Sequence, residues 1–370
     1  MLSGKWHLWL GIAVSVVMLL FLAWQVYRFE DPSGLIDELA GANYFFLIPA
    51  VAVYFVGVWF RAFRWQFLLN PLRYFPVKRL YPVVVIGYAA NNLLPMRLGE
   101  LVRSYYLARQ ENFSATSALG SVAVERVFDG LTLIVLVAIA VPWLLLMGAF
   151  DWTAGISRET AVVLAGAVLF VFGGFLLLFT LLAAWQGFSD LVGRLLSLLP
   201  GRLGDIALRF YVSFAAALSI LDSPRKHLAL IALSLPIWFC EFIVYYLVSY
   251  TFDLGSHFDS QGAYLLAIAL LTATSNLATG IPSAIGGIGP FEVVAQQTLV
   301  ALGVGVGVAI DYALVVHLVA LWLPVNAVGL AILWKQNLNL RQLVQEPQEE
   351  ENGTASEIPA ANSSPVTGGS

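Results

Sequence analysis

The sequence has one cysteine, four histidines and few charged residues. Cys240 stands alone inside an apolar run, so a disulfide framework or a thiolate metal cluster has no residues to build on. Charged residues make up 11% of the chain, compared with about a quarter in soluble domains. The chain also lacks a Walker A sequence, a GxSxG motif, an HExxH motif and a GxGxxG motif after a strand. These absences exclude a soluble globular protein and give no support to ATP hydrolysis or a familiar hydrolase site.

Hydrophobic residues make up 59% of the chain and occur in long uncharged blocks. Each block is close to the ~20 residues that a helix requires to cross ~30 Å of hydrocarbon. The predicted blocks are Leu8 to Tyr27, Leu39 to Phe60, Gly130 to Phe150, Thr160 to Phe188, Leu228 to Phe252 (interrupted by Glu241), Ser260 to Phe291, Val293 to Ile310 and Tyr312 to Trp334. The first is long, is followed by Arg28 and lacks a cleavage pattern, so we expect a retained span rather than a signal peptide. The pattern predicts an all-α integral membrane protein, a polytopic helical bundle of six to eight transmembrane helices.

The basic residues predict an orientation, because cytoplasmic loops carry an excess of Lys and Arg. Two basic segments are predicted to be cytoplasmic: Arg61, Arg64, Arg73, Lys78 and Arg79, and Arg194, Arg202, Arg209, Arg225 and Lys226. Acidic loops are predicted to be external: Glu30, Asp31, Asp37 and Glu38, then Asp151 and Glu159, then Asp253 and Asp259. Both termini are then cytoplasmic and the number of full crossings is even. We expect the protein in the cell (cytoplasmic or inner) membrane.

The chain is predicted to have two parts. Residues 1–340 contain all the apolar blocks and are predicted to form one transmembrane domain. Residues 341–370 are rich in Glu, Asn, Ser, Pro and Gly and have few apolar anchors. This composition predicts a disordered polar tail.

Two apolar regions fit poorly as ordinary spans. Leu80 to Leu107 is broken at Pro95 and lies between cytoplasmic flanks, which predicts a re-entrant helical hairpin entering from inside. Gly262 to Leu302 is broken by several Gly and Pro residues and fits either two crossings or one hairpin entering from outside. Two interrupted segments at corresponding places are typical of an inverted-repeat transporter. Alternatively, Asn, Gly and Pro simply gather wherever membrane helices break.

A cluster of charged residues near the first break is the richest candidate site. Its members are Arg97, Glu100, Arg103, Glu125, Arg126 and Asp129. Charged side chains at membrane depth cost about 2.5–3.5 kcal/mol each, so they require a partner or a water-filled cavity. The three arginines suit a lipid phosphate through charge-assisted hydrogen bonds, with the acids orienting them or binding a cationic headgroup. The alternative is an ion-pair network that neutralises itself. A metal is not predicted, because no histidine lies nearby.

The second candidate site is the glycine-rich break that contains Gly286, Gly287 and Gly289 and leads to Pro290 and Glu292. Proline at the first helical position marks a helix N-terminus, whose free N–H groups and positive dipole end suit a phosphate. In the alternative interpretation Glu292 satisfies that dipole itself. We favour a turn that serves both purposes, because a break at membrane depth usually lines a cavity.

Three further polar residues lie in the predicted spans. Glu241 is alone in its span, and either carries a proton for coupled transport or pairs with a hydroxyl or Arg on a neighbouring helix. Asp311 and His317 stand at the start of the last span and are interpreted as interfacial.

The charged motifs also resemble a known family. Asn92-Leu93-Leu94-Pro95-Met96-Arg97-Leu98-Gly99-Glu100-Leu101-Val102-Arg103, then Val124-Glu125-Arg126-Val127-Phe128-Asp129, then Pro282, Gly286-Gly287-Ile288-Gly289 and Glu292 resemble the lysylphosphatidylglycerol synthase transmembrane (flippase-like domain) family. The resemblance covers roughly Leu8 to Trp334. It implies an anionic lipid or a lipid-linked sugar as substrate, since the family is associated with flipping aminoacylated phosphatidylglycerol and with polyprenyl-phosphate glycolipid pathways. A short polar tail follows the last span, so we do not expect the soluble transferase domain of the full-length synthases.

These observations predict a flippase-like protein that translocates an anionic phospholipid or a polyprenyl-phosphate-linked glycolipid. We expect no enzymatic activity, no cofactor, no metal and no nucleic-acid partner. Two alternatives remain: a membrane-embedded transferase with a lipid-phosphate donor and Glu125 or Asp129 as base, or a non-catalytic scaffold of envelope biogenesis. The sequence leaves the oligomeric state open.

Overall fold

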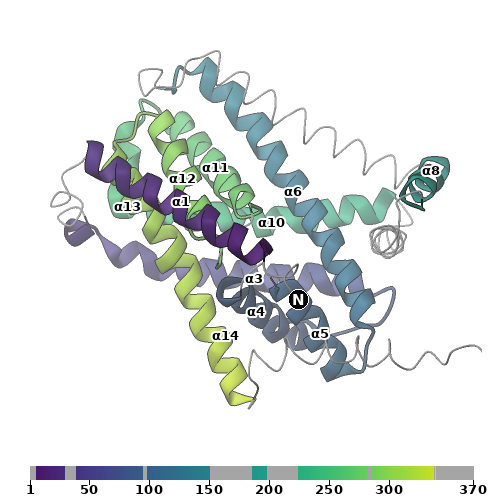
Figure 1. The fold of residues 1–370 in the computed structure, drawn as a ribbon. Coiled ribbons are helices and arrows are strands. Elements are labelled where there is room, and N and C mark those ends of the chain that lie inside the picture. Colours follow the sequence, from purple (N-terminus) through teal and green to yellow (C-terminus); the bar gives the residue numbers. More distant parts are fainter. Residues whose placement is uncertain are drawn as a thin grey trace, which may run out of the picture.

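The fold is a bundle of membrane-spanning helices (Figure 1). The computed structural model describes residues 6–29, 39–94, 98–150, 186–197, 224–281, 283, 285–336 and 338. Within these ranges there is no strand, and six helical segments are long and apolar enough to cross a membrane. They are Trp9–Arg28, Tyr44–Leu69, Ala115–Leu146, Leu228–Phe252, Gln261–Ala278 and Val306–Lys335. The predicted polytopic all-α membrane fold is therefore confirmed.

The helices form two halves of similar layout. The first half contains α3 (Leu47–Leu69), α4 (Val77–Leu93), α5 (Gly99–Glu111) and α6 (Ala115–Leu146). The second contains α10 (Pro224–Ser249), α11 (Gln261–Ala278), α12 (Pro290–Ala301) and a last helix made of α13 (Val306–Leu314), the π-helical segment η5 (Val315–Trp322) and α14 (Leu323–Lys335). The remaining elements are α1 (Trp6–Phe29), α8 (Gln186–Ser197), η1 (Tyr44–Phe46), η3 (Tyr250–Phe252) and η4 (Leu254–His257). Each half is a long helix, a hairpin of two shorter helices and another long helix.

Local signals in the sequence set several helix ends. The Ser114 hydroxyl accepts the Ser117 N–H at 3.2 Å at the start of α6, and Ser260 caps α11 in the same way. Each cap satisfies one of the four N–H groups that have no partner within a helix. Helix α5 ends at Glu111 and is capped by Asn112, whose φ of 48° lies in the left-handed region that Asn tolerates.

The two halves run in opposite directions. Helix α3 packs along α10. The Asn43 N–H donates to the Thr251 carbonyl at 3.3 Å near one end of this contact. Further along, the Arg64 Nη1 donates to the Ser234 hydroxyl at 2.9 Å. Residue numbers rise along α3 as they fall along α10, so the two helices are antiparallel.

The packing between the halves is reciprocal. The hairpin helix α4 of the first half packs on α14 of the second, and the hairpin helix α11 of the second half packs on α6 of the first. Within each half the two hairpin helices pack together, and the second of them packs on the long helix that follows. Together with the antiparallel contact of α3 and α10, this arrangement is that of an inverted repeat.

The structure corrects two predicted helix boundaries. The second span does not end at Phe60, because α3 continues to Leu69 and places Arg61 and Arg64 inside the bundle rather than in a loop. The predicted span Val293 to Ile310 is also wrong. Helix α12 ends at Ala301, and Gly303, with a φ of 85°, lies in the break before α13.

Other predictions fall partly or wholly outside the described residues. The block Thr160 to Phe188 overlaps them only at the start of α8, and the tail 341–370 lies outside them. The division into a domain of residues 1–340 and a polar tail therefore stays a prediction. The first broken region is confirmed as a helical hairpin, α4 with α5. Helix α12 has 12 residues, or about 18 Å at 1.5 Å per residue, so it is too short to cross the bilayer alone.

We predict that Gly99→Ala destabilises the first hairpin. A Cβ at Gly99 would collide with the backbone oxygen of Gly87 and the backbone nitrogen of Asn91, because α5 begins directly against α4. Overpacking of this kind costs about 1–3 kcal/mol. Thermal unfolding of the detergent-purified protein should show a lower Tm for this variant. Gly41→Ala is the control, because nothing lies within 4 Å of its added Cβ; equal Tm values for the two variants would contradict the close approach.

Candidate functional site

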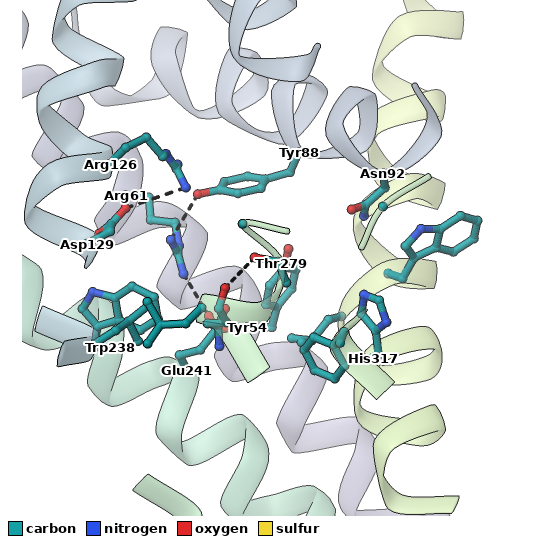
Figure 2. A pocket seen from close by; sticks show the side chains of 18 of the residues that line it. Tyr54, Arg61, Tyr88, Asn92, Arg126, Asp129, Trp238, Glu241, Thr279 and His317 are labelled. Atoms are coloured by element: carbon teal, nitrogen blue, oxygen red, sulfur yellow. Dashed lines mark hydrogen bonds and ion pairs between the residues drawn. The ribbon is translucent and has the colours of Figure 1, made fainter. Parts of the chain in front are cut away.

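A central cavity of about 260 Å³ lies between the two halves (Figure 2). The first half lines it with residues of α3, α4 and α6, and the second half with residues of α10, α11, α12 and the last helix. Asn92 lies near the end of α4, and Thr279, Gly280 and Gly286 belong to the break between α11 and α12. Both interrupted segments therefore meet the cavity. We refer to it below as the central cavity.

Arg61 and Glu241 form an ion pair in the wall of the central cavity. The Arg61 Nη2 lies 2.9 Å from the Glu241 Oε2, and the Arg61 Nη1 donates to the Tyr88 hydroxyl at 3.1 Å. Figure 2 shows Arg61 between these two partners. The pair joins α3, α4 and α10, and both side chains are buried. Glu241 is thus not alone, and the predicted alternative of an Arg partner is confirmed.

A second network is buried and reaches the cavity wall through Asp129. Arg64 binds Asp129 through its Nη1 and Nη2, at 2.7 and 3.0 Å, which is the bidentate geometry that suits a carboxylate. Arg103 pairs with Glu125, and its guanidinium group stacks on the Trp65 ring at 4.3 Å. This network ties α3 and α5 to α6. Arg103 and Glu125 do not line the central cavity, so they favour the predicted self-neutralising network over direct binding.

Arg126 is the most accessible of the cluster's arginines that the structure describes. Its side chain is 34% exposed, whereas that of Arg64 is 1% exposed. Its Nε lies 3.2 Å from the Glu100 Oε1 and its Nη1 lies 3.9 Å from the Asp129 Oδ2, so its ion pairs leave donor capacity. It lines the central cavity. Arg126 is therefore the arginine best placed to meet an anionic ligand.

The glycine-rich break forms a tight turn that Glu292 closes. Gly286, Gly287 and Gly289 have positive φ values of 57°, 85° and 100°, a region that glycine enters without strain. The Gly289 N–H donates to the Glu292 Oε2 at 2.7 Å. Glu292 therefore satisfies the helix N-terminus, as the alternative interpretation predicted. Gly286 lines the central cavity, while Gly287, Gly289 and Glu292 do not.

His317 is a cavity residue that the sequence interpretation missed. Its Nδ1 lies 2.6 Å from the Glu292 Oε1, and its ring stacks on Phe291 with centroids 4.0 Å apart. It is 5% exposed and belongs to η5, a π-helical segment of a kind often found at functional sites. Asp311 and His317 do not begin the last helix, as the sequence interpretation had it, because that helix starts at Val306 and both side chains are buried within it.

The structure brings only some of the predicted site residues into one place. Arg126, Asp129 and Gly286 line the central cavity, and Glu100 contacts it through Arg126. Arg97 lies outside the described residues. Arg61, Tyr88, Trp238, Glu241 and His317 join the site from elements that the sequence did not connect. One signal was available: Arg61 and Arg64 are three residues apart, and the apolar residues after them continue a helical pattern.

The family of the chain follows from a comparison with known families. Residues 8–327 match the family described as the lysylphosphatidylglycerol synthase TM region. The chain belongs to this family. The protein is therefore a multi-pass membrane protein of a lipid-related family, and the predicted resemblance is confirmed.

Two curated proteins are similar to the chain along most of its length. A protein of Haloferax volcanii named glycosyltransferase AglD is 25% identical over 364 residues, which cover 92% of this chain and 56% of AglD. A UPF0104 membrane protein of Methanothermobacter thermautotrophicus is 25% identical over 335 residues, which cover 88% of this chain and 93% of that protein. The chain thus spans little more than half the length of AglD. No solved structure matches the chain significantly.

The comparison corrects the prediction that the chain is not an enzyme. That prediction is wrong, because a related protein is named a glycosyltransferase. The central cavity brings together the carboxylates of Asp129 and Glu241 and the guanidinium groups of Arg61 and Arg126. The same groups also suit the binding of an anionic headgroup.

Proposed function

We propose that the central cavity binds the headgroup of an anionic lipid, either a phospholipid or a polyprenyl-phosphate-linked glycolipid, and moves it across the bilayer. The observation that carries this proposal is the accessible Arg126 beside Arg61, in a cavity that two inverted halves build together. In inverted-repeat transporters the substrate binds at the interface of the repeats, near broken helices. The two halves then expose the site to each side in turn.

The size and lining of the cavity support a headgroup as ligand. Its volume of about 260 Å³ is below the ~300–1,000 Å³ of pockets for drug-sized ligands, so acyl chains would stay in the surrounding lipid. Trp238 is buried in the wall, and its Nε1 has no hydrogen-bond partner among the described residues. A buried donor usually has a partner, and a phosphate or hydroxyl oxygen in the cavity would provide one.

The orientation proposed here is that both termini are cytoplasmic, in the cell membrane. Several contacts place the ends of different helices together: Arg73 donates to the Glu111 carbonyl at 2.7 Å, and Tyr106 donates to Gln336. Basic residues at this end include Arg73, Lys78, Arg79, Arg109 and Lys335. Their clustering supports a cytoplasmic end. A cysteine at Lys78 (Lys78→Cys in a Cys240→Ser chain) should react with an impermeant maleimide only in inside-out vesicles; reaction in intact cells would reverse the orientation.

Photocrosslinking tests the binding part of the proposal. A phosphatidylglycerol and a polyprenyl phosphate with a photoreactive group on the headgroup are added to the purified protein, and labelled peptides are identified by mass spectrometry. We expect labels on peptides that line the central cavity, from α6 and from the break between α11 and α12. A phosphatidylcholine probe is the control for annular lipid. Equal labelling by all three probes, on lipid-facing surfaces alone, would contradict a headgroup site.

A second candidate is glycosyl transfer from a lipid-phosphate donor, which the name of the relative AglD supports. Asp129 or Glu241 would act as the base, since both line the cavity. Glu125, the other predicted base, is paired with Arg103 outside the cavity. Incubation of the detergent-purified protein with a radiolabelled polyprenyl-phosphate sugar and acceptor lipid extract separates the two candidates. Translocation cannot be observed in detergent, because a micelle does not have two separate leaflets. A glycosylated product that forms with the wild type and is lost in Asp129→Asn and Glu241→Gln therefore favours glycosyl transfer.

A further inference from the structure

Arg126 and His317 occupy equivalent positions in the two halves. Arg126 follows the first residue of α6, Ala115, by eleven residues, and His317 follows the first residue of the last helix, Val306, by eleven residues. Each lines the central cavity. Each also pairs with an acid in the first turn of the helix before it, Arg126 with Glu100 of α5 and His317 with Glu292 of α12. The inverted repeat therefore places Arg126, a permanent cation, on the first half's side of the central cavity and His317, a titratable group, on the second half's side.

The hydrogen bonds of Glu292 determine which ring nitrogen of His317 is available. The Glu292 Oε2 accepts the Gly289 N–H at 2.7 Å, and its Oε1 lies 2.6 Å from the His317 Nδ1. A carboxylate accepts hydrogen bonds, so the Nδ1 carries a hydrogen and donates it. In neutral His317 the Nε2 is then the atom without a proton. Stacking on Phe291 holds the ring in place.

Glu292 differs from the other paired acids in its partner. Among the described residues, three buried acids pair with arginines, Glu241 with Arg61, Asp129 with Arg64 and Glu125 with Arg103, and the partly exposed Glu100 pairs with Arg126. Glu292, which is 1% exposed, pairs with a histidine instead. A buried carboxylate beside a neutral histidine has no positive charge to balance it. A proton on His317 turns the histidine into a cation that balances the charge of Glu292.

Several other charged and titratable groups surround His317. Those that share the central cavity with it are Arg61 and Tyr54 of α3, Tyr88 of α4, Arg126 and Asp129 of α6, and Glu241 of α10. Asp311 lies six residues earlier on the same helix and is also buried. The arginines opposite are paired with carboxylates, so the field at His317 is not dominated by unpaired positive charge.

We propose that the Glu292–His317 pair binds one proton together with the anionic headgroup, and that this proton couples headgroup movement to a pH gradient. The inference rests on the proposed function. The protonated His317 gives the second half the cation that Arg126 gives the first half, so the cavity has a cationic group from each half that is in direct contact with it only when it holds the proton. Ionisable chains of this kind act as proton carriers in membrane transporters.

The first experiment measures proton uptake directly. Short-chain phosphatidylglycerol and short-chain polyprenyl phosphate are added to the detergent-purified protein in weak buffer with a pH dye. We expect about one proton taken up per bound probe, as for a single linked site. His317→Gln should abolish the uptake, whereas His257→Gln, at an exposed position of η4, should preserve it. No uptake with either probe, or uptake retained in His317→Gln, overturns the inference.

The second experiment separates the inference from the proposed function. In proteoliposomes, the exposure of a fluorescent headgroup to dithionite is followed with and without an imposed pH gradient. A gradient of one unit should change the rate by up to about tenfold in the wild type and in His257→Gln, but not in His317→Gln. If the rate of headgroup movement does not depend on the pH gradient and no proton is taken up on binding, proton coupling is overturned and the proposed translocation still stands. Proton uptake on binding without any movement of the headgroup overturns the proposed translocation, whereas the proton-binding site still stands.

Discussion

Arg126→Ala is expected to slow headgroup movement by about ten- to a hundredfold, while the variant inserts into the membrane normally. Arg126 is the accessible arginine of the central cavity, and a hydrogen bond to a charged group contributes about 1.5–3 kcal/mol. Glu100 would lose its partner, but that side chain is 28% exposed and remains partly solvated. The rate is measured in proteoliposomes by dithionite quenching of a fluorescent anionic lipid.

Two matched variants show whether the effect is specific. Arg126→Lys keeps the charge but loses the bidentate fork, so it should retain part of the rate. Arg225→Ala removes an exposed arginine at the start of α10 and should move lipid at the wild-type rate. Normal movement by Arg126→Ala would show that the headgroup does not use this side chain.

Arg64→Ala is expected to destabilise the folded protein by about 3–5 kcal/mol, because it leaves buried carboxylates without their cation. Asp129 would lose both short hydrogen bonds from Arg64, and the nearest Arg126 nitrogen is 3.9 Å away. The Glu125 Oε1 lies 4.0 Å from the Arg64 Nε and would lose that charge as well. Thermal unfolding in detergent should show the loss as a clearly lower Tm or a low yield of folded protein.

A double variant tests the cause of that loss. Arg64→Met with Asp129→Leu replaces the pair by apolar side chains, which is often neutral for a buried ion pair. It should recover most of the Tm lost in Arg64→Ala. A double variant that is less stable than Arg64→Ala would show that the arginine stabilises α3 by packing rather than by pairing with Asp129.

The sequence predicted the bundle because the bilayer constrains helices so strongly. The apolar blocks located α1, α10 and the last helix closely, since a span requires ~20 apolar residues. The breaks at Pro95 and around Gly286 predicted interrupted segments, and the weak internal similarity suggested an inverted repeat. The boundaries of α3 and α12 were wrong. Charges were interpreted as loop ends, although partners on other helices allow a charge to lie inside a span, as Arg61 does.

The site was predicted only in part, because its contacts join residues far apart in the chain. Arg61 and Glu241 are 180 residues apart, and a single sequence does not reveal that they meet. Glu125, Arg126 and Asp129 were found through their spacing on one helix, but the spacing did not show that Glu125 faces away from the cavity. His317 has no charge pattern around it. Its role became visible only through its contact with Glu292 and its equivalence to Arg126.

The central claim is that the cavity moves an anionic headgroup between leaflets. Its most direct test uses fluorescent phosphatidylglycerol and polyprenyl-phosphate analogues in one leaflet of proteoliposomes, with the wild-type protein compared with empty liposomes and with a zwitterionic phosphatidylcholine analogue. We predict faster exposure of at least one anionic analogue to dithionite in the presence of protein, and no acceleration of the zwitterionic one. Anionic analogues that are exposed no faster than in empty liposomes, with or without an imposed pH gradient, would contradict the proposed translocation.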